Sequence, residues 1–290
     1  MNILQNDNLI VESKSFGAEL TRIYSKQNNK DILWCGDEKY WGRRSPILFP
    51  IVGRLKENKT LIEDNIYSMG QHGFARDMDF KVIETSNDHV VYLLTSNDST
   101  KKFYPYDFDL SIKYTLIDNS IRIDWIVENT DSRDIYFSIG AHPAFNIPTS
   151  KHKSINDYYL KFNYKDKVNK INLNGPFHDE SFEVENLDKL QLSPELFIND
   201  ALIYTDIDSI SIFNNEDKEE INVEFSKFPL VGIWSPYYSE DNTIAPFICI
   251  EPWYGLCDNI NSDNVYKNKA YINKLSVGKS FKTSYTITVY

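Results

Sequence analysis

The chain has 290 residues, with 31 Lys and Arg against 42 Asp and Glu, which gives a net charge of −11. A surface of that sign repels nucleic acid and anionic lipid, so neither is expected as a partner. Apolar residues make up 41% and charged residues 25% of the sequence, which is typical of folded globular proteins and excludes a disordered chain.

Neither an export signal nor a membrane span is visible in the sequence. The segment from Met1 to Lys14 carries Asn and Gln where a signal peptide has an apolar run, and there is no apolar run of roughly 18 residues. The cysteines are too few and too scattered for a disulfide framework; they are Cys35, Cys249 and Cys257. We therefore expect a cytoplasmic protein.

Short segments with alternating apolar and polar residues dominate the chain. In order, they cover residues 8–15, 18–25, 90–95, 108–116, 120–127, 134–139 and 280–290. Alternation with a period of two is typical of strands that bury one face, and clusters of turn residues separate these segments. The short and even spacing predicts an all-β fold, with antiparallel strands packed as a sandwich or barrel.

Helical patterns are scarce. A short helical turn is expected within residues 187–198, around Pro194 to Phe197, whereas residues 163–190 are polar and irregular and are expected to form a long surface excursion. No repeat, flexible linker or block of charge marks a boundary, so we expect one domain over residues 1–290.

Four segments depart from the strand pattern. Each combines Pro or Gly with aromatic and ionisable residues, and together they cover residues 41–56, 70–77, 138–148 and 233–255. Because loops on a rigid sheet often carry binding and catalytic residues, we expect the functional site to be built from these segments.

Two histidines in these segments are candidates for the site. His142 follows an apolar strand and precedes Pro143, which favours an extended backbone, and imidazole can move protons near neutral pH. His72 stands beside Gly73 in a predicted tight turn. A purely structural histidine is as good an interpretation for His142 and a slightly better one for His72. The other histidines lie in polar surroundings and are expected to face solvent; they are His89, His152 and His178.

Glu251 is the most informative carboxylate. It follows the apolar run 246–250 and precedes Pro252 and Trp253, so we expect it to be partly buried. Burial raises the pKa of a carboxyl group and makes it a better base near neutral pH. The alternative is a buried glutamate paired to an arginine for stability alone, and the catalytic interpretation is favoured.

The remaining candidates are polar or aromatic. Asp200 precedes a predicted strand, and on its own it indicates only an Asx turn. Arg54 and Arg76 stand beside apolar or aromatic residues and would need an acidic or anionic partner if buried. Tryptophan rings either belong to the core or form the wall of a sugar pocket, and the ones in these segments are Trp41, Trp234 and Trp253.

Motifs for nucleotides, activated serine and zinc are absent. The chain has no Walker A sequence, no G-x-G-x-x-G after a strand, no G-x-S-x-G and no H-E-x-x-H. A metal held by His72, His142 and Glu251 is conceivable, but these residues lack the close pairwise spacing of typical ligands. We therefore expect neither a metal nor a cofactor.

Five short motifs together resemble the aldose 1-epimerase (mutarotase) family, and most of all its LacX-like bacterial branch. They occur in order along nearly the whole chain and read GR at 53–54, HGFAR at 72–76, GAHPAF at 140–145, NDALI at 199–203 and IEPW at 250–253. The resemblance implies a large antiparallel β-sandwich of the galactose mutarotase-like supersandwich type. It also implies interconversion of the α and β anomers of a free sugar without a metal or cofactor.

The resemblance implies a role for each matching residue. Glu251 corresponds to the general base and His142 to the general acid, which we expect on opposite sides of the sugar ring. The substrate contacts implied or expected beside them are His72, Arg54, Asp200, Arg76, Trp234 and Trp253.

The sequence leaves the substrate open. The HGFAR run is similar to that of the hexose-6-phosphate mutarotase branch, and Arg76 with Arg43 and Arg44 could hold a phosphate. We expect a free aldohexose such as galactose or glucose, with a 6-phosphorylated hexose as the alternative. Two other hypotheses are a non-catalytic carbohydrate-binding or sensing protein and a metal-dependent sugar isomerase. The sequence does not distinguish a monomer from a homodimer.

Overall fold

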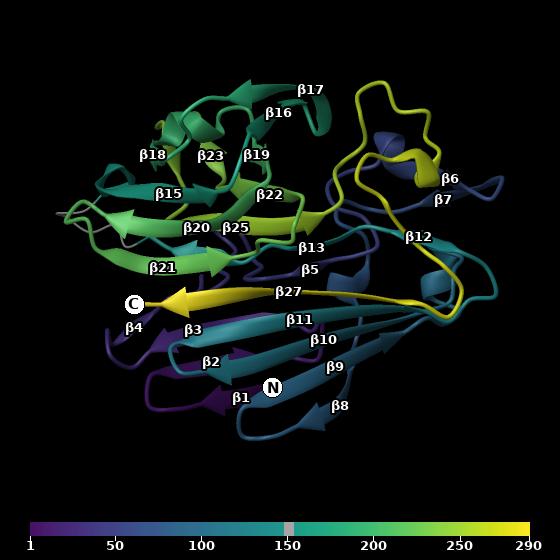
Figure 1. Cartoon of the computed structure of the whole chain (residues 1–290), viewed down its shortest axis with the longest axis horizontal. Coiled ribbons are helices and arrows are strands. Elements are labelled where there is room, and N and C mark those ends of the chain that lie inside the picture. The colour runs from purple at the N-terminus through teal and green to yellow at the C-terminus, as the bar shows by residue number, and fades with distance from the viewer. Residues whose placement is uncertain (148–153) are drawn as a thin grey trace.

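The computed structural model describes residues 1–147 and 154–290. These residues form antiparallel strands joined by loops and by single turns of 3-10 helix (Figure 1), which confirms the prediction of an all-β fold. Within the described residues, no helix has the length and apolar character needed to cross a membrane.

The larger sheet has nine strands in the order β18-β15-β20-β21-β27-β11-β10-β9-β8. Its strands are β8 (Lys81–Thr85), β9 (His89–Thr95), β10 (Phe108–Ile117), β11 (Ser120–Asn129), β15 (Tyr158–Tyr164), β18 (Lys189–Gln191), β20 (Ile207–Asn214), β21 (Glu219–Glu224) and β27 (Ser280–Val289). Buried residues alternate along β10, as its sequence predicts, so one face of this sheet covers the core.

The second sheet has eight strands. The path runs β17-β16-β19-β22-β25-β13-β5, and β14 pairs with β25 beside β13. Its strands are β5 (Ile47–Leu48), β13 (Ile139–Ala141), β14 (Ala144–Asn146), β16 (Val168–Asn174), β17 (Phe177–Val184), β19 (Leu202–Thr205), β22 (Leu230–Trp234) and β25 (Phe247–Tyr254). One face packs on the nine-stranded sheet, because Ile250 and Ile233 share a hydrophobic core with Trp125 and Tyr285. The other face carries the site described below.

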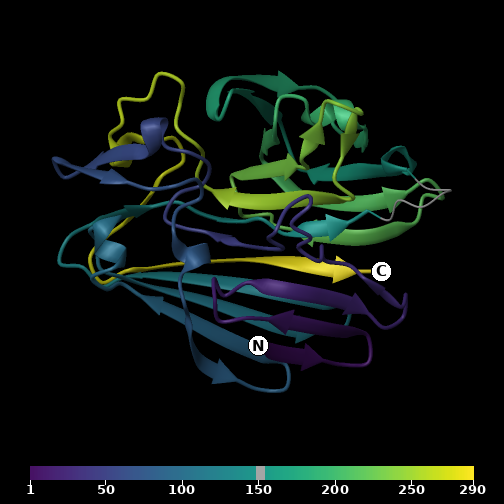
Figure 2. The ribbon, with the colours of Figure 1, turned by 180° about the vertical axis from the view of Figure 1, so that it is seen from behind.

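A four-stranded sheet at the N-terminus lies against the same face of the nine-stranded sheet (Figure 2). Tyrosines link the two sheets, since the Tyr92 hydroxyl lies 2.7 Å from Ser13 Oγ and the Tyr114 hydroxyl donates to the Ala18 carbonyl at 2.7 Å. The strands are β1 (Asn2–Gln5), β2 (Leu9–Ser13), β3 (Leu20–Ser25) and β4 (Lys30–Asp31).

Small elements fill the connections. Three two-stranded ribbons pair β6 (Lys59–Ile62) with β7 (Asn65–Ser68), β12 (Ile135–Phe137) with β26 (Asn273–Leu275), and β23 (Tyr237–Tyr238) with β24 (Thr243–Ile244). The 3-10 turns are η1 (Lys56–Asn58), η2 (Ala75–Asp77), η3 (Thr100–Lys102), η4 (Ile155–Asp157), η5 (Pro194–Phe197) and η6 (Tyr266–Asn268). The turn expected around Pro194 is therefore confirmed as η5.

The structure corrects three expectations. Residues 163–190 are not an irregular excursion, because most of them form the hairpin β16–β17 at the edge of the eight-stranded sheet. The single strand expected at 134–139 is divided between β12 and β13, which pair in different sheets. His178 is half-buried and contacts the Asn259 amide, and the His89 side chain is only 17% exposed between Glu84 and Asp88. His152 lies outside the described residues.

Candidate functional site

The register of the eight-stranded sheet gathers the predicted residues on one face. Along β25, alternate side chains point to the same side, so Glu251 and Trp253 share a face. On the neighbouring strand β22, Gly232 pairs with Glu251. Trp234 is two residues after Gly232 and therefore lies on the same face of the sheet. A Cβ atom at Gly232 would stand 2.3 Å from Cη2 of Trp253. The absence of a side chain there lets the indole lie flat across the sheet.

His142 lies between β13 and β14, which both pair with β25, and it stands opposite Glu251. Gly140 pairs with Trp253 and Ala144 pairs with Cys249. His142 is midway between Gly140 and Ala144, and it therefore faces Glu251, which is midway between Cys249 and Trp253. His142 Nε2 and Glu251 Oε1 are 3.3 Å apart, and the two residues are 6% and 1% exposed. The two groups are therefore adjacent, and the expectation that they lie on opposite sides of a sugar ring is wrong.

Burial controls the protonation of this pair. It raises the pKa of the Glu251 carboxyl well above its usual value, and the negative charge of Asp200 raises it further. Burial lowers the pKa of the His142 imidazole to about 3, and the positive charge of Arg76 acts in the same direction. A single proton shared across the 3.3 Å contact leaves the pair without net charge, which is the state that a buried site tolerates best.

His72 presents a fixed hydrogen-bond donor beside this pair. Its backbone is left-handed, with φ of 67°, and the Gly53 N–H donates to His72 Nδ1 at 3.1 Å. Burial lowers the pKa of the His72 imidazole well below its usual value, so the ring is neutral. Because Nδ1 accepts, the hydrogen of the neutral ring is on Nε2. The His72 and His142 rings meet edge to face, with centroids 5.5 Å apart.

Two arginines and Gln71 form the cationic side of the pocket. Arg76 donates from Nη2 to the Gln71 carbonyl at 2.6 Å, and Arg54 donates from Nε to the Gln71 side chain at 3.2 Å. Burial lowers the pKa of the Arg76 guanidinium to about 10, so it stays charged at neutral pH. Arg43 pairs with Asp77 at 2.8 Å and lies outside the pocket lining.

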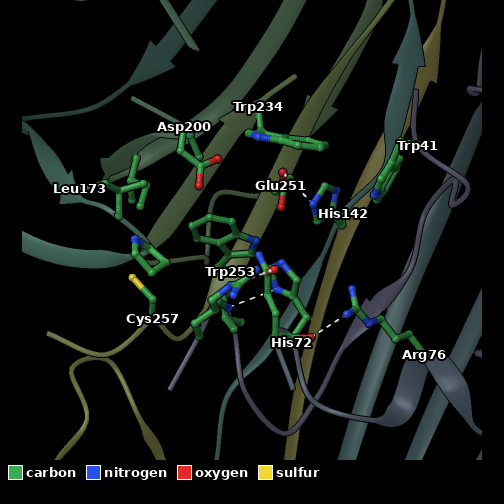
Figure 3. Close-up of a pocket in the computed structure, with 17 residues that line it drawn as sticks. Trp41, His72, Arg76, His142, Leu173, Asp200, Trp234, Glu251, Trp253 and Cys257 are labelled. Atoms are coloured by element: carbon green, nitrogen blue, oxygen red, sulfur yellow. Dashed lines mark hydrogen bonds and ion pairs between the residues drawn. The ribbon is translucent and has the colours of Figure 1, made fainter. Parts of the chain in front are cut away.

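Aromatic rings and a carboxylate complete the walls. Trp41 stacks on the His142 ring with centroids 4.7 Å apart, and Trp234 meets the same ring edge-on at 5.5 Å. Asp200 reaches solvent at the pocket rim, yet the surrounding protein raises the pKa of its carboxyl. Figure 3 shows Asp200 and Arg76 at opposite ends of the site, with Glu251 and His142 between them.

All eight predicted site residues line one pocket of about 530 Å³, a volume in the range of small-molecule sites. Sequence reasoning missed several other lining residues. Leu173 and Pro176 come from the hairpin β16–β17, Gln71 lies inside the segment 70–77, and Cys257 follows the segment 233–255. The Asn174-Gly175 pair is a strong signal for a tight hairpin turn and could have revealed β16–β17.

Comparisons with known proteins identify the family and the fold of this chain. The profile of the aldose 1-epimerase family matches residues 2–269. The protein LacX (chromosomal) of Lactococcus lactis subsp. lactis is 30% identical over 99% of this chain and 98% of its own length. A galactose mutarotase related enzyme from Lactobacillus acidophilus superimposes with a TM-score of 0.95 at 32% identity, covering 100% of this chain and 97% of the other.

A galactose mutarotase-like protein from Lactobacillus casei superimposes with a TM-score of 0.93 at 28% identity, and the match covers 100% of both chains. Structural likeness and family profile therefore both extend over nearly the whole sequence. On these grounds the chain belongs to the aldose 1-epimerase family.

Proposed function

We propose that this protein is an aldose 1-epimerase that interconverts the α and β anomers of a free aldohexose such as galactose or glucose. The observation that carries the proposal is the contact between Glu251 and His142, two buried groups 3.3 Å apart in a pocket of sugar size. Opening a pyranose ring requires one proton to leave the anomeric hydroxyl and one to reach the ring oxygen. Both oxygens are bonded to one carbon, so an acid and a base that are neighbours can reach both of them in one bound sugar.

The shared proton gives a balanced cycle. The raised pKa of Glu251 and the lowered pKa of His142 place the shared proton on Glu251 at rest, so the cycle begins when this proton crosses to His142. The Glu251 carboxylate then takes the proton of the anomeric hydroxyl while the imidazolium protonates the ring oxygen, and the bond from that oxygen to the anomeric carbon breaks. The open aldehyde rotates about its bond to the next carbon. Closure on the other face then reverses both transfers. The two proton positions of the pair are the start and the end of ring opening, so no proton has to enter from solvent.

The surrounding residues bind and polarise the substrate in this proposal. The Nε2–H of His72 points to the region where charge develops on the reacting oxygens, and such a fixed donor stabilises the transition state. Trp253 and Trp234 offer flat apolar faces to the sugar ring. Asp200 accepts hydrogen bonds from hydroxyl groups at the far end of the pocket.

A 6-phosphorylated hexose is the second candidate, because Arg54 and Arg76 line the pocket and the buried Nε of Arg76 makes no hydrogen bond of standard geometry among the described residues. We favour the free sugar. The Gln71 carbonyl already holds Arg76, Asp77 already pairs with Arg43, and the net charge of −11 opposes a dianion.

The test is anomer exchange measured by NMR on glucose and galactose and on their 6-phosphates, with Arg76→Ala and, as a matched control, the exposed Arg122→Ala. We expect the free sugars to exchange faster than the phosphates and Arg122→Ala to behave like the parent. A strong preference for phosphates that collapses only in Arg76→Ala would establish the second candidate.

The same assay tests two other hypotheses. Binding of sugar without exchange would indicate a carbohydrate-binding protein. Loss of exchange in EDTA with recovery on adding a divalent ion would indicate a metal-dependent isomerase.

A further inference from the structure

Cys249 lies beside the acid–base pair but has no part in the proposed chemistry. It precedes Glu251 by two positions on β25 and therefore points to the same face of the strand. It also pairs with Ala144, two residues beyond His142. One potential ligand atom each from His142, Cys249 and Glu251 lies within 4.8 Å of the other two.

The separations suit a tetrahedral zinc ion. Nitrogen and oxygen ligands at about 2.0–2.1 Å from such an ion stand about 3.3–3.4 Å apart, and a thiolate at about 2.3 Å stands about 3.5 Å from them. His142 Nε2 and Glu251 Oε1 are already 3.3 Å apart. Cys249 Sγ lies within 4.8 Å of both partner atoms, so it would need to approach each of them by at most about 1.3 Å.

One unpartnered atom belongs to the same carboxyl group. Glu251 Oε2 is buried and makes no hydrogen bond of standard geometry within the described part of the chain, whereas the other unpartnered atom, His142 Nδ1, is the ring nitrogen that the ion would not use. Cys249 is 0% exposed and packs with Phe247 and Trp34. Glu251 and His142 line the pocket and Cys249 does not. An ion would therefore enter from the pocket and keep its fourth position open there.

We propose that His142, Cys249 and Glu251 form an inhibitory site for a zinc ion, one per chain. Binding replaces the Cys249 thiol proton and the proton shared by the other two residues, and both protons pass to solvent. The ion then holds the acid and the base together, so it competes with the sugar. Hard cations such as Mg²⁺ prefer sets of oxygen ligands and are excluded by the thiolate and imidazole.

The primary test measures binding and not activity, so that its failure differs from failure of the epimerase proposal. Zinc is titrated calorimetrically into the full chain, into Cys249→Ser and into the matched control Cys35→Ser, whose cysteine is exposed. We expect one ion per chain and a loss of affinity of at least about 10-fold in Cys249→Ser, since even an outer-shell partner of a metal contributes about 10–100-fold. Cys35→Ser should bind like the parent.

Two further measurements make the outcome decisive. Cobalt(II) bound to the unsubstituted protein should show tetrahedral absorption with a thiolate charge-transfer band, which does not depend on a variant folding. In anomer exchange, zinc should inhibit the parent competitively and Cys249→Ser much less. The proposal is overturned by absence of binding, by a cobalt spectrum without a thiolate band, by equal binding of Mg²⁺, or by affinity that depends on Cys257 and not on Cys249.

Discussion

Glu251 is an ionisable group within a strand that is otherwise apolar on both faces. The imidazole of His142, which lies 3.3 Å from its carboxyl group, is the polar group that pairs with it. The burial of β25 is complete from Phe247 to Trp253. A carboxyl group in such a place is costly unless it shares a proton or a hydrogen bond. The contact with His142 supplies that compensation, so the feature that makes the pair tolerable in the fold also makes it able to exchange protons.

We predict that Glu251→Gln and His142→Asn each slow anomer exchange by at least about 10², because a positioned acid or base typically contributes about 10²–10⁴. Both replacements are close in shape to the original side chains, so the unfolding midpoint should show that the fold is intact. Exchange is measured by NMR at saturating sugar. An exposed carboxylate variant, Glu128→Gln, serves as the control. Retention of more than about a tenth of the activity would remove that residue from the mechanism.

His72 lies in a short turn that sets both its backbone and its tautomer. The left-handed φ of 67° and the hydrogen bond from Gly53 hold the ring, and the next residue, Gly73, has no room for a Cβ because it would lie 2.3 Å from the Phe49 carbonyl oxygen. The turn therefore fixes the position and the tautomer of the His72 imidazole. Asparagine suits the same backbone region and its oxygen can take the place of Nδ1.

We predict that His72→Asn reduces the dependence of stability on pH. The unfolded chain protonates this imidazole below about pH 6.5, whereas burial and the nearby arginines keep it neutral in the folded protein. The free energy of unfolding should therefore fall as pH decreases from about 6.5, by up to about 1.4 kcal/mol per pH unit for this group. Urea unfolding in EDTA from pH 7.5 to 5 measures the difference between parent and variant. Parallel curves for the two proteins would contradict a neutral, buried His72.

Gly232 lies where β22 and β25 pack closely, because the Trp253 indole of β25 covers it. We predict that Gly232→Ala displaces the Trp253 indole, lowers exchange activity and costs about 1–3 kcal/mol of stability, as overpacking does. Gly70→Ala is the matched control, because nothing lies within 4 Å of its added Cβ and its effect should stay within about 0.5 kcal/mol. Chemical denaturation and NMR exchange read out both variants. Full activity in Gly232→Ala would show that the position of Trp253 is not required.

Alternation in the sequence located the strands that bury one face, such as β10, β11 and β27. It failed where a strand is buried on both faces, because β25 has no polar face and Glu251 was placed at the end of an apolar run instead of inside a strand. It also failed for the hairpin β16–β17, where exposed polar residues on both strands hide the pairing. Local sequence patterns indicate which face of a strand is buried. They fail for β25, which is buried on both faces, and for β16–β17, which is largely exposed.

At the scale of the molecule, the pocket joins segments that are distant in the chain. Trp41 and Cys257 both line it, and no local pattern brings such residues together. The family resemblance predicted which motifs converge, and the residues of these motifs do line one pocket. The distance between His142 and Glu251 could not be predicted that way, since it depends on the register of β13 and β14 against β25.

A buried ion pair links the C-terminal part of the chain to the loop that carries Arg54. The side chains of Lys269 and Asp258 are each 2% exposed and are paired to each other. Asp258 also accepts a hydrogen bond from the Lys56 N–H at 2.8 Å, and its own N–H donates to the Arg54 carbonyl at 2.9 Å. Asp258 thus ties the Lys269 side chain to the backbone of the loop that carries Arg54.

We predict that Lys269→Met destabilises the protein by about 3–5 kcal/mol, because it leaves the Asp258 charge buried without a cationic partner. Combining it with Asp258→Asn should recover part of the loss, since no buried charge remains and the amide oxygen can still accept from Lys56. Lys274→Met is the control, because its pair with Asp134 is 56% and 37% exposed and should contribute at most about 1 kcal/mol. Urea unfolding at one fixed pH measures five proteins: the parent, Lys269→Met, Asp258→Asn, the double variant and Lys274→Met. The free energy lost in the double variant is compared with the sum of the losses in Lys269→Met and Asp258→Asn. If the two losses simply added, the two residues would act independently, and the pair would not be the link between these segments.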